Sequence, residues 1–390
     1  MRDVPVYLDH NATTPLDPRV AEAMLPWLGG RHGNPSSVHS FGRAARAAVE
    51  QAREQVAGLI GATAPEVAFM ASGTEANNAV LMSVFDDGAG GHLVISELEH
   101  PSIQRAADRL ENSGVEVNRL RPGPDGLVDA GAVADALRPE TRLACLMLAN
   151  NELGTLQPVA EAADACRERG VPLLCDAVQA AGKHPVDVNS LGADYLVVAA
   201  HKFTGPVGAA ALWIREGAAF EPLILGGGQE RQRRAGTENV AALVGFGACA
   251  ALASSELDHR IERLGRLRDG LEAGLAGIAD THLHCASSPR LPHTTHVAFA
   301  GLIGEELVVR LDLAGFAVST GAACASGVVE PSRTLLAMGV SPEEAIASIR
   351  ISLGTSNDRD EIDRFLPVLA REVEALRALS AEPATGVAAR

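Results

Sequence analysis

The sequence lacks the features that mark a membrane-spanning or exported protein. No uninterrupted run of about eighteen apolar residues, the length that spans a bilayer, occurs in its 390 residues. Residues 1–8 include Asp3 and Pro5 and do not show the basic and then apolar layout of a signal peptide. We therefore expect a cytoplasmic protein with no membrane partner.

Basic side chains are also fewer than acidic ones. The chain has 33 Lys and Arg against 49 Asp and Glu, which gives a formal net charge of −16. A field of that sign repels phosphate backbones and anionic lipid surfaces. Direct binding to nucleic acid is therefore not expected.

Cysteine is sparse, and none of the six cysteines forms a Cys-x-x-Cys pair. A zinc or iron–sulfur site built from local spacing is therefore unsupported, and we expect no metal site. Cys145, Cys175 and Cys249 lie inside apolar runs, which is typical of small buried hydrophobic residues. Cys324 differs, because it lies among the Gly, Ala and Ser residues of 320–327, a composition typical of a loop.

What the sequence does have is an alternation of strand-length apolar runs and helical spacing between residues 66 and 214. The expected strands are Val67–Met70, His92–Ile95, Leu143–Leu148, Pro172–Cys175, Tyr195–Ala199 and Ala210–Ile214, and the expected helices are Thr74–Phe85, Ile103–Glu111 and Val159–Arg169. Continuous apolar strands separated by helices predict a mostly parallel sheet covered on both faces. The fold class is therefore α/β.

The pattern changes after Ser254. A long charged helix near 256–273 is followed by helices mixed with a few short strands, which predicts a smaller α+β lobe. We expect a large α/β domain over 15–255 and a small domain built from 1–14 and 256–380. The tail 381–390 is rich in Ala and has no periodicity, so it is expected to be disordered.

A first polar motif, Met70-Ala-Ser-Gly-Thr-Glu-Ala-Asn, stands where a strand passes into a helix. Gly73 permits close approach of the backbone, and Thr74 can cap the helix while its hydroxyl meets an anion. Taken alone, the motif is more typical of a plain strand–helix turn.

A second motif places Asp176 at the end of an apolar strand, with Gln179 just beyond it. In open α/β sheets, ligands bind outside the carboxyl ends of the strands. A carboxylate at that edge requires a cationic partner. A helix N-cap is an equally good interpretation of Asp176.

A third motif places Lys202, preceded by His201, directly after the apolar strand 195–199. Most lysines lie on the surface, but a lysine at a strand end can be desolvated and is then a Schiff-base candidate. Pyridoxal phosphate needs an acid for its ring nitrogen, an amine for its aldehyde and amides for its phosphate. Together with Asp176 and Gly73, the lysine predicts a pyridoxal phosphate site.

The chain resembles the cysteine desulfurases of the class V aminotransferase group, in particular the type that serves nitrogen fixation and iron–sulfur cluster assembly. The matching stretches run in order to about residue 354: Leu8-Asp-His-Asn-Ala-Thr-Thr-Pro-Leu-Asp-Pro, Gly33-Asn-Pro-Ser-Ser-Val-His, Ser72-Gly-Thr-Glu-Ala-Asn-Asn, Glu99-His-Pro-Ser, Asn150-Asn-Glu-Leu-Gly-Thr, Asp176-Ala-Val-Gln, His201-Lys, Arg234-Ala-Gly-Thr-Glu-Asn, Gly321-Ala-Ala-Cys-Ala-Ser-Gly and Ile349-Arg-Ile-Ser-Leu-Gly. The resemblance implies fold type I of the pyridoxal phosphate enzymes, with a seven-stranded type of sheet in the large lobe. It also implies a homodimer.

The resemblance implies three catalytic residues. Lys202 carries the cofactor as a Schiff base, and His100 stacks on the cofactor ring and shuttles protons. Cys324 attacks the sulfur of L-cysteine as a thiolate, leaving a persulfide on the protein and releasing alanine. A sulfur-acceptor protein, for iron–sulfur clusters or thiolation, is then the partner.

The binding residues are likewise implied by the resemblance. Asp176 pairs with the ring nitrogen, and Gln179 and Asn151 lie near the phenolic oxygen. The phosphate is bound by Gly73, Thr74 and His201. Thr237 binds the phosphate from the neighbouring subunit. Arg350 receives the substrate carboxylate, a bidentate role that suits a guanidinium group, with Asn34 near the substrate.

One position departs from the family pattern. The family usually has Ser two residues before the His of the His-Lys pair, where it contacts the phosphate, and this chain has Ala199. The loss of one hydrogen bond would weaken cofactor retention by about 1 kcal/mol.

Several alternatives remain open at this point. His100 could be a surface residue at a helix start, since Pro101 suits a first turn, and Arg350 could pair with Glu343 or Glu344. His282 and His284 are more typical of a solvated strand than of a metal site. The activity could be selenocysteine lysis or another class V reaction, and a silent sulfur-carrier scaffold is the alternative outside enzymes.

Overall fold

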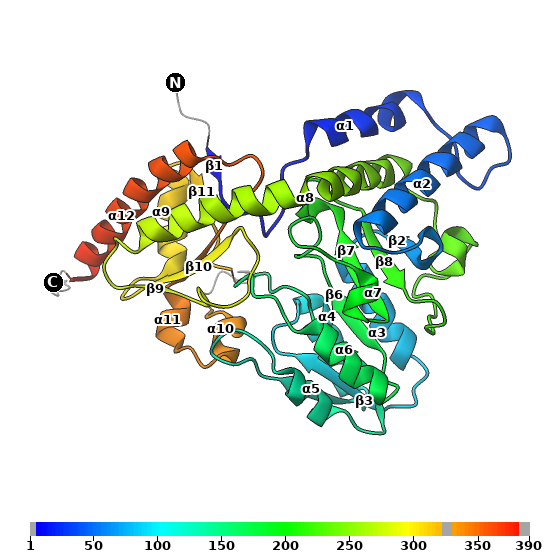
Figure 1. Ribbon diagram of the computed structural model, residues 1–390, viewed down its shortest axis with the longest axis horizontal. Helices are drawn as coiled ribbons and strands as arrows, with labels where there is room; N and C mark the ends of the chain where they lie inside the picture. Colours follow the sequence, from blue (N-terminus) through cyan, green and yellow to red (C-terminus); the bar gives the residue numbers. More distant parts are fainter. Residues whose placement is uncertain (1–4, 322–329, 382–390) are drawn as a thin grey trace, which may run out of the picture.

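The computed structural model describes residues 5–321 and 330–381 and shows a large α/β unit beside a smaller α+β unit (Figure 1). The predicted disordered tail therefore lies outside the described residues, apart from residue 381. The α/β prediction is confirmed, because the large unit is built on one seven-stranded sheet flanked by helices.

The large sheet has the strand order β2-β8-β7-β6-β5-β3-β4. Its strands are β2 (Val67–Met70), β3 (His92–Ser96), β4 (Glu116–Leu120), β5 (Thr141–Cys145), β6 (Leu173–Asp176), β7 (Tyr195–Ala199) and β8 (Ala210–Ile214). β8 runs antiparallel to both of its neighbours, whereas the other pairs are parallel. The parallel strands therefore present their carboxyl ends at one common edge.

Helices cover both faces of this sheet, as continuous apolar strands require. The helices and single turns of the large unit are α1 (Pro18–Leu25), η1 (Pro26–Gly30), α2 (Ser40–Leu59), η2 (Ala64–Glu66), α3 (Gly73–Phe85), α4 (Pro101–Asn112), α5 (Ala130–Ala136), α6 (Val159–Glu168), α7 (Val188–Leu191), η3 (Ala200–Lys202) and η4 (Gln229–Gln232). One core cluster joins α2, α5 and α6 to one face, and a second joins α3 and α4 to the other.

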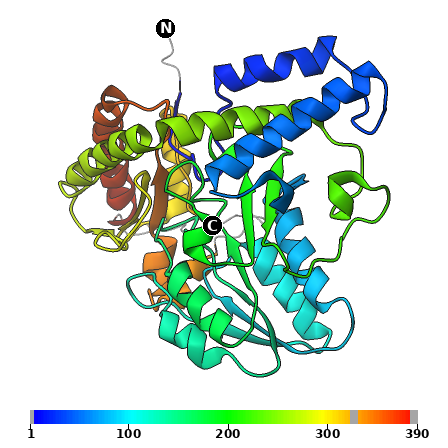
Figure 2. The same cartoon turned by 45° about the vertical axis from the view of Figure 1, so that its right-hand side comes forward.

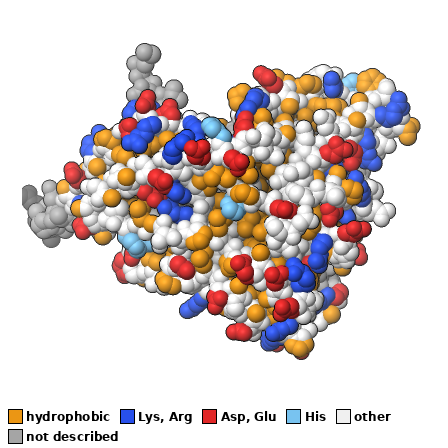
Figure 3. Space-filling view, in the orientation of Figure 1, with side chains coloured by type: hydrophobic (Ala, Val, Ile, Leu, Met, Phe, Trp, Pro, Cys, Tyr) orange, Lys and Arg blue, Asp and Glu red, His pale blue; other side chains and the backbone are white. Residues whose placement is uncertain are grey.

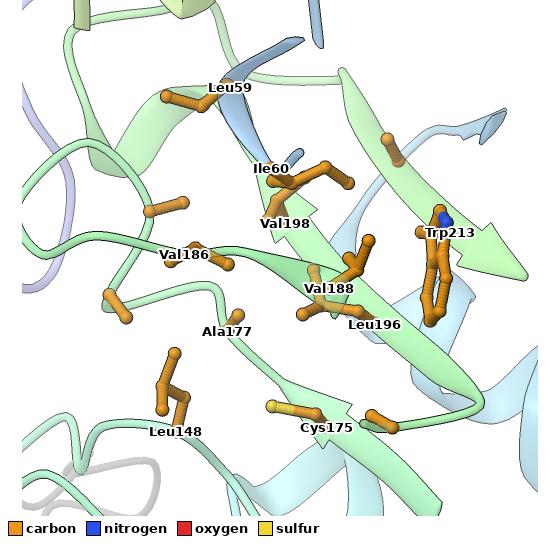
Figure 4. Close-up of a cluster of buried hydrophobic side chains, with 14 of the residues drawn as sticks. Leu59, Ile60, Leu148, Cys175, Ala177, Val186, Val188, Leu196, Val198 and Trp213 are labelled. Atoms are coloured by element: carbon orange, nitrogen blue, oxygen red, sulfur yellow. The ribbon is translucent and has the colours of Figure 1, made fainter. Parts of the chain in front are cut away.

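Alternating side chains of single strands enter the two clusters. Figure 4 shows Cys175, Leu196 and Val198 on the first face, close to Val186 and to Val188, the first residue of α7. Their neighbours in the strands point to the second face, which packs on α3 and α4. The sheet is therefore buried on both sides and forms a rigid support for groups at its edge.

The small unit contains two short sheets. β1 (Val6–Tyr7) pairs in parallel with β11 (Phe316–Ala317), and β9 (Thr281–Leu283), β10 (Thr294–Phe299) and β12 (Ser348–Ser352) form an antiparallel sheet of order β12-β10-β9. Its helices are α9 (Gly304–Leu313), α10 (Arg333–Ala337), α11 (Pro342–Ile346) and α12 (Arg359–Ala381). The N-terminal strand thus belongs to the small unit, while α1 and α2 pack on the large one (Figure 2).

A single helix, α8 (Val240–Leu275), runs through both units. It begins well before the charged stretch expected at 256–273, and the predicted domain boundary at 255/256 falls inside it. By length and composition, α8 could also cross a membrane, but half of its most apolar window is buried inside the protein. Core helices meet the same test, so this is weak evidence for a membrane segment.

The surface drawn in Figure 3 carries mixed charges. Lys and Arg side chains are interspersed with Asp and Glu and form no continuous basic patch on this face.

Candidate active site

The carboxyl ends of β6 and β7 bring Asp176 and Lys202 into the same region. The two strands are adjacent and parallel, and Asp176 is the last residue of β6. Lys202 ends the short turn η3, which follows β7 directly. The sequence motifs, 26 residues apart in number, therefore meet at one edge of the sheet, as the position of ligands in open α/β sheets requires.

The amine of Lys202 is held by backbone carbonyl groups. Its Nζ donates to the oxygen of Asn11 at 2.7 Å and to that of Ala12 at 2.8 Å. Burial, together with the nearby Arg350, lowers the pKa of Lys202 to about 8, while Asp176 opposes both effects. About a tenth of this amine is therefore in the neutral, nucleophilic form at pH 7, far more than for an exposed lysine.

Asp176 is buried and held from two sides. Its Oδ2 accepts a hydrogen bond from Asn77 Nδ2 at 2.8 Å, and its Oδ1 accepts one from the Val178 amide at 3.0 Å. It is not a helix N-cap, since α7 begins only after Asp187. Its orientation is thus fixed by α3 and by the turn that follows β6.

Gln179 lies one turn beyond Asp176 and contacts the N-terminal segment. Its Nε2 donates to the same Asn11 oxygen that binds Lys202, at 3.0 Å, and its Oε1 accepts from Lys183 Nζ at 3.3 Å. Asn11 therefore links the lysine and the glutamine.

His100 is the N-cap of α4, and Pro101 is the first helical residue. This agrees with the helix-start interpretation, but the ring also lies within the electrostatic reach of Asp176 and Lys202. Its Nδ1 accepts from the Ser102 amide at 3.1 Å, which leaves the proton of the neutral ring on Nε2. Burial lowers the pKa of His100, so the neutral ring predominates at pH 7.

The N-terminus of α3 differs in one detail from the expectation. The N-cap is Ser72, whose Oγ accepts from the Glu75 amide at 3.1 Å, so the prediction that Thr74 caps the helix was wrong. The helix begins one residue earlier because Ser72 has the extended backbone that an N-cap needs. Thr74 is exposed in the first turn, and its hydroxyl is not used for capping.

Gly73 is the first residue of α3, and His201 directly precedes the lysine in η3. A Cβ atom on Gly73 would lie 3.1 Å from Val178 Cγ2, so only glycine packs easily against the segment after β6. His201 Nδ1 pairs with Thr13 Oγ1 at 3.1 Å. Burial lowers the pKa of His201 to about 4, so its ring is neutral at pH 7.

Arg350 reaches this region from β12 of the small unit. Its Nη2 pairs with Asp9 Oδ1 at 2.5 Å, and its Nη1 donates to the Asn151 oxygen at 2.9 Å. The alternative pairing with Glu343 or Glu344 was therefore wrong. Its buried Nε has no hydrogen-bond partner within the described part of the chain.

The structure does not bring every predicted residue into this cluster. Asn34 lies in an exposed turn before α2, where its Oδ1 accepts from the Ser36 amide at 2.9 Å. Thr237 is exposed in the segment between η4 and α8, as a residue that serves a neighbouring subunit can be. Cys324 lies outside the described residues.

Asn11 is the residue that sequence reasoning missed. It is 1% exposed, and its Oδ1 accepts from His293 Nε2 at 2.7 Å while its Nδ2 donates to Thr294 Oγ1 at 3.0 Å. These bonds fix the carbonyl that binds Lys202. The available signal was the polar run that directly follows the apolar residues 6–8, within a matched stretch to which no role was given.

Known proteins resemble the chain over nearly its whole length. The family profile of aminotransferase class V matches residues 6–365. "Cysteine desulfurase IscS" of Dictyoglomus turgidum is 44% identical over 378 residues, covering 96% of each chain. "Cysteine desulfurase IscS 1" of Archaeoglobus fulgidus is 39% identical over 376 residues, covering 96% of this chain and 98% of that protein.

Solved structures share the fold as well. A "NifS-like protein" superposes with a TM-score of 0.90 at 33% identity and covers 96% of this chain and 100% of its own. A structure titled "SspA in complex with cysteine" has a TM-score of 0.79 at 31% identity, with coverage of 89% and 98%. The chain therefore belongs to the class V aminotransferase family and, within it, groups with the cysteine desulfurases.

Proposed function

We propose that this chain is a cysteine desulfurase that uses pyridoxal phosphate to remove sulfur from L-cysteine and release L-alanine. The observation that carries the proposal is the meeting of Lys202 and Asp176 at adjacent strand ends, with Arg350 close enough to lower the pKa of the lysine. An amine, an acid and a carboxylate-binding guanidinium are the groups that this reaction on an amino acid needs.

The donor set fits pyridoxal phosphate. Asp176 is a buried carboxylate that can hold the ring nitrogen protonated, and Lys202 is the amine that can bind the aldehyde. The free amides at the start of α3, together with Thr74 and His201, suit a phosphate group. When bound, this cofactor supplies an electron sink for the carbon atoms of the substrate.

The remaining residues orient the substrate and move protons. Within residues 5–321 and 330–381, the buried Nε of Arg350 has no hydrogen-bond partner, which makes it a ready donor to the substrate carboxylate. His100 carries its proton on Nε2 in the neutral form and can donate it to a reacting atom. The carbonyl groups of Asn11 and Ala12 hold the lysine amine whenever it is free.

Cys324 is the proposed sulfur acceptor. Its thiolate attacks the substrate sulfur, the carbon–sulfur bond breaks with its electron pair left on carbon, and that carbon takes up a proton to give alanine. The product on the protein is a persulfide. This step needs a thiolate, because the neutral thiol is a poor nucleophile.

The five described cysteines are unsuitable as nucleophiles, which supports the choice of Cys324. Cys145, Cys166, Cys175 and Cys249 are buried, and Cys285 is half-buried. Burial raises the pKa of Cys166 to about 12 and that of Cys285 to about 11, and it raises the other three pKa values as well. At neutral pH all five described cysteines are protonated and inert.

The persulfide would pass to a sulfur-acceptor protein for iron–sulfur clusters or thiolation, in the cytoplasm. We also propose a homodimer in which Thr237 of one subunit serves the phosphate site of the other. The exposed position of Thr237 supports this arrangement.

The test uses two substitutions and a control. Cys324→Ala should keep the visible absorption of the bound cofactor but form no sulfide or persulfide from cysteine. Lys202→Ala should lose the absorption band of the lysine-bound cofactor. Cys285→Ala, which alters the one half-buried cysteine of the described part, should keep full activity. Undiminished sulfide release by Cys324→Ala would refute its role.

A further inference from the structure

Two histidines and a glutamate form a cluster on the β9 edge of the small sheet. His282 lies in β9 and His284 just after it, and Glu344 comes from α11, which lies next to this edge in Figure 1. One nitrogen of each histidine and one carboxylate oxygen all lie within 4.8 Å of one another. No other group of three such side chains occurs with this spacing in residues 5–321 and 330–381.

The contacts within the cluster leave it open to solvent on one side. His282 Nδ1 contacts Glu344 Oε1, and His284 Nε2 lies 3.8 Å from the same oxygen. The side chain of His282 is 66% exposed, that of Glu344 is 35% exposed and that of His284 is 2% exposed. An ion could therefore enter from solvent and meet a ligand fixed in the protein interior.

Each of the three residues is held by regular structure. His284 continues the pairing of β9 with β10, since its amide donates to the His296 oxygen at 3.0 Å. Its ring contacts the rings of His282 and His296. On the other side, α11 is capped by Ser341, whose Oγ accepts from the Glu344 amide at 3.2 Å. Ligands on sheets and capped helices are placed more accurately than ligands on loops.

We propose that His282, His284 and Glu344 bind a divalent transition-metal ion, Zn²⁺ in the first place, with water at the remaining position. Two imidazole nitrogens and one carboxylate oxygen form a ligand set that zinc accepts in proteins, and imidazole suits this group of metals. The spacing of the two histidines alone favoured a solvated strand. The third ligand, 62 residues from His282, is visible only in the fold.

The site would join two elements that the chain does not connect directly. The ion would tie β9 to α11, and α11 leads directly into β12. Binding to the folded state alone raises the free energy of unfolding. Zinc should therefore raise the melting temperature, and this readout does not depend on catalysis.

Two hydrogen bonds compete with the ion. The first joins two of the proposed ligands, His282 Nδ1 and Glu344 Oε1, and an ion bound between them would replace it. The second involves a serine. His284 Nε2 lies 3.2 Å from Ser348 Oγ, which itself donates to the Glu344 backbone oxygen at 2.7 Å. A metal ion at Nε2 would replace the bond to the serine. Ser348→Ala should therefore bind zinc at least as tightly as the parent protein.

The experiment uses the full-length, tag-free protein with its cofactor, in a Cys324→Ala background that removes the most reactive thiol. After treatment with a chelator, titration calorimetry with Zn²⁺ should show one site per chain. His282→Ala and Glu344→Gln should each weaken binding by at least about 10-fold. Each should also abolish the zinc-dependent rise in melting temperature.

Two neighbours that are not ligands serve as matched controls. His259→Ala alters an exposed histidine on α8, and Glu343→Gln alters the exposed residue next to Glu344. Both should keep the affinity of the background protein. Should His282→Ala fold poorly, His282→Asn replaces it.

The proposal is overturned if the background protein binds no zinc, or if the ligand variants bind it as tightly as the controls do. In that case the cluster is a hydrogen-bonded His–Glu pair only. Because the background protein lacks Cys324, neither result depends on whether the chain is a desulfurase.

Discussion

Lys202 shows how strongly the surroundings of one residue set its chemistry. The amine is partly buried, and its hydrogen-bond partners are two neutral carbonyl oxygens rather than a carboxylate. Burial removes water from the ammonium group, the neutral carbonyls compensate that loss only in part, and the nearby guanidinium of Arg350 repels the charge. Burial and this repulsion favour the free base, which is why the pKa falls from 10.5 to about 8.

This shift predicts the pH dependence of cofactor attachment. The neutral amine is the reacting form, and its fraction rises as the pH rises through about 8. The rate at which the cofactor-free protein binds pyridoxal phosphate covalently should therefore increase from pH 6.5 to 9 and then level off. Stopped-flow absorbance measures this rate. A rate that stays constant over this range would contradict the shifted pKa.

Ala199 offers a second test at the scale of one residue. It lies at the end of β7 on the face that packs on α3, and it stands where the family usually has a serine. Ala199→Ser should restore one hydrogen bond to the phosphate and tighten cofactor binding by about 1 kcal/mol, roughly fivefold. Equilibrium dialysis gives the dissociation constant.

The matched control for this change is Val198→Thr. Val198 points to the opposite face of the sheet, so its added hydroxyl cannot reach the phosphate. Equal affinities of Ala199→Ser and the parent protein would show that this position does not contact the phosphate.

Among the elements, the turn η4 stores backbone strain. Glu230, Arg231 and Gln232 have φ values of 48°, 54° and 66°, a left-handed conformation that non-glycine residues rarely adopt. The buried carboxylate of Glu230 accepts from Arg53 at 2.5 and 2.9 Å and from the Phe69 amide at 2.7 Å. These bonds fasten the strained turn to the edge of the large sheet.

We therefore expect Glu230→Gln to be strongly destabilising. It leaves the guanidinium of Arg53 buried without its main countercharge, which costs about 3–5 kcal/mol. Urea unfolding measures the loss in the free energy of unfolding. Glu50→Gln removes the more exposed carboxylate beside Arg53 and should cost less than about 1 kcal/mol. Equal losses for the two variants would refute a special role for Glu230.

The elements also show what sequence patterns can and cannot predict. The bounds of β2, β7 and β8 were predicted correctly because each is a continuous apolar run. β4 was missed because it is a partly exposed edge strand in which three of the five residues are polar. α2 was missed because its sequence is dominated by small and charged residues, and its burial depends on packing against α8.

The candidate site, like the secondary structure, was predicted from the sequence only in part. Asp176 and Lys202 follow apolar strands, so their place at the sheet edge can be derived from the strands alone. Asn11 and Asp9 belong to the N-terminal segment, far from Lys202 and Arg350 in the sequence, and only the tertiary fold brings them to the site. Contacts between distant segments have no signature in local spacing.

At the scale of the whole molecule, the N-terminal helices expose apolar side chains. Leu25 and Leu28 are 62% and 66% exposed, and Val38 and Phe41 are 88% and 55% exposed. These residues lie on the projection formed by α1, η1 and α2 (Figure 2). Exposed apolar groups gathered in this way are typical of a surface that another chain covers.

We predict a dimer that depends on this surface. Sedimentation should give twice the 40.5 kDa of one chain, and Leu28→Asp should shift the protein towards the monomer. Leu379→Asp, on the distant helix α12, changes a leucine that is also exposed and should leave the dimer intact. A parent protein that sediments as a monomer at micromolar concentration would contradict the prediction.

The 36-residue helix α8 determines how the two units can move. An unbroken helix of this length is a rod of about 54 Å, and this one contacts both η3, where Lys202 lies, and β10, beside the strand of Arg350. Phe246 near one end belongs to the core of the large unit, and Leu271 near the other belongs to the core of the small one. A hinge between these points would have to break a packed helix. The distance between Lys202 and Arg350 is therefore set by the helix. An amino acid binds between two groups at a fixed spacing, and its binding does not require the two units to close around it.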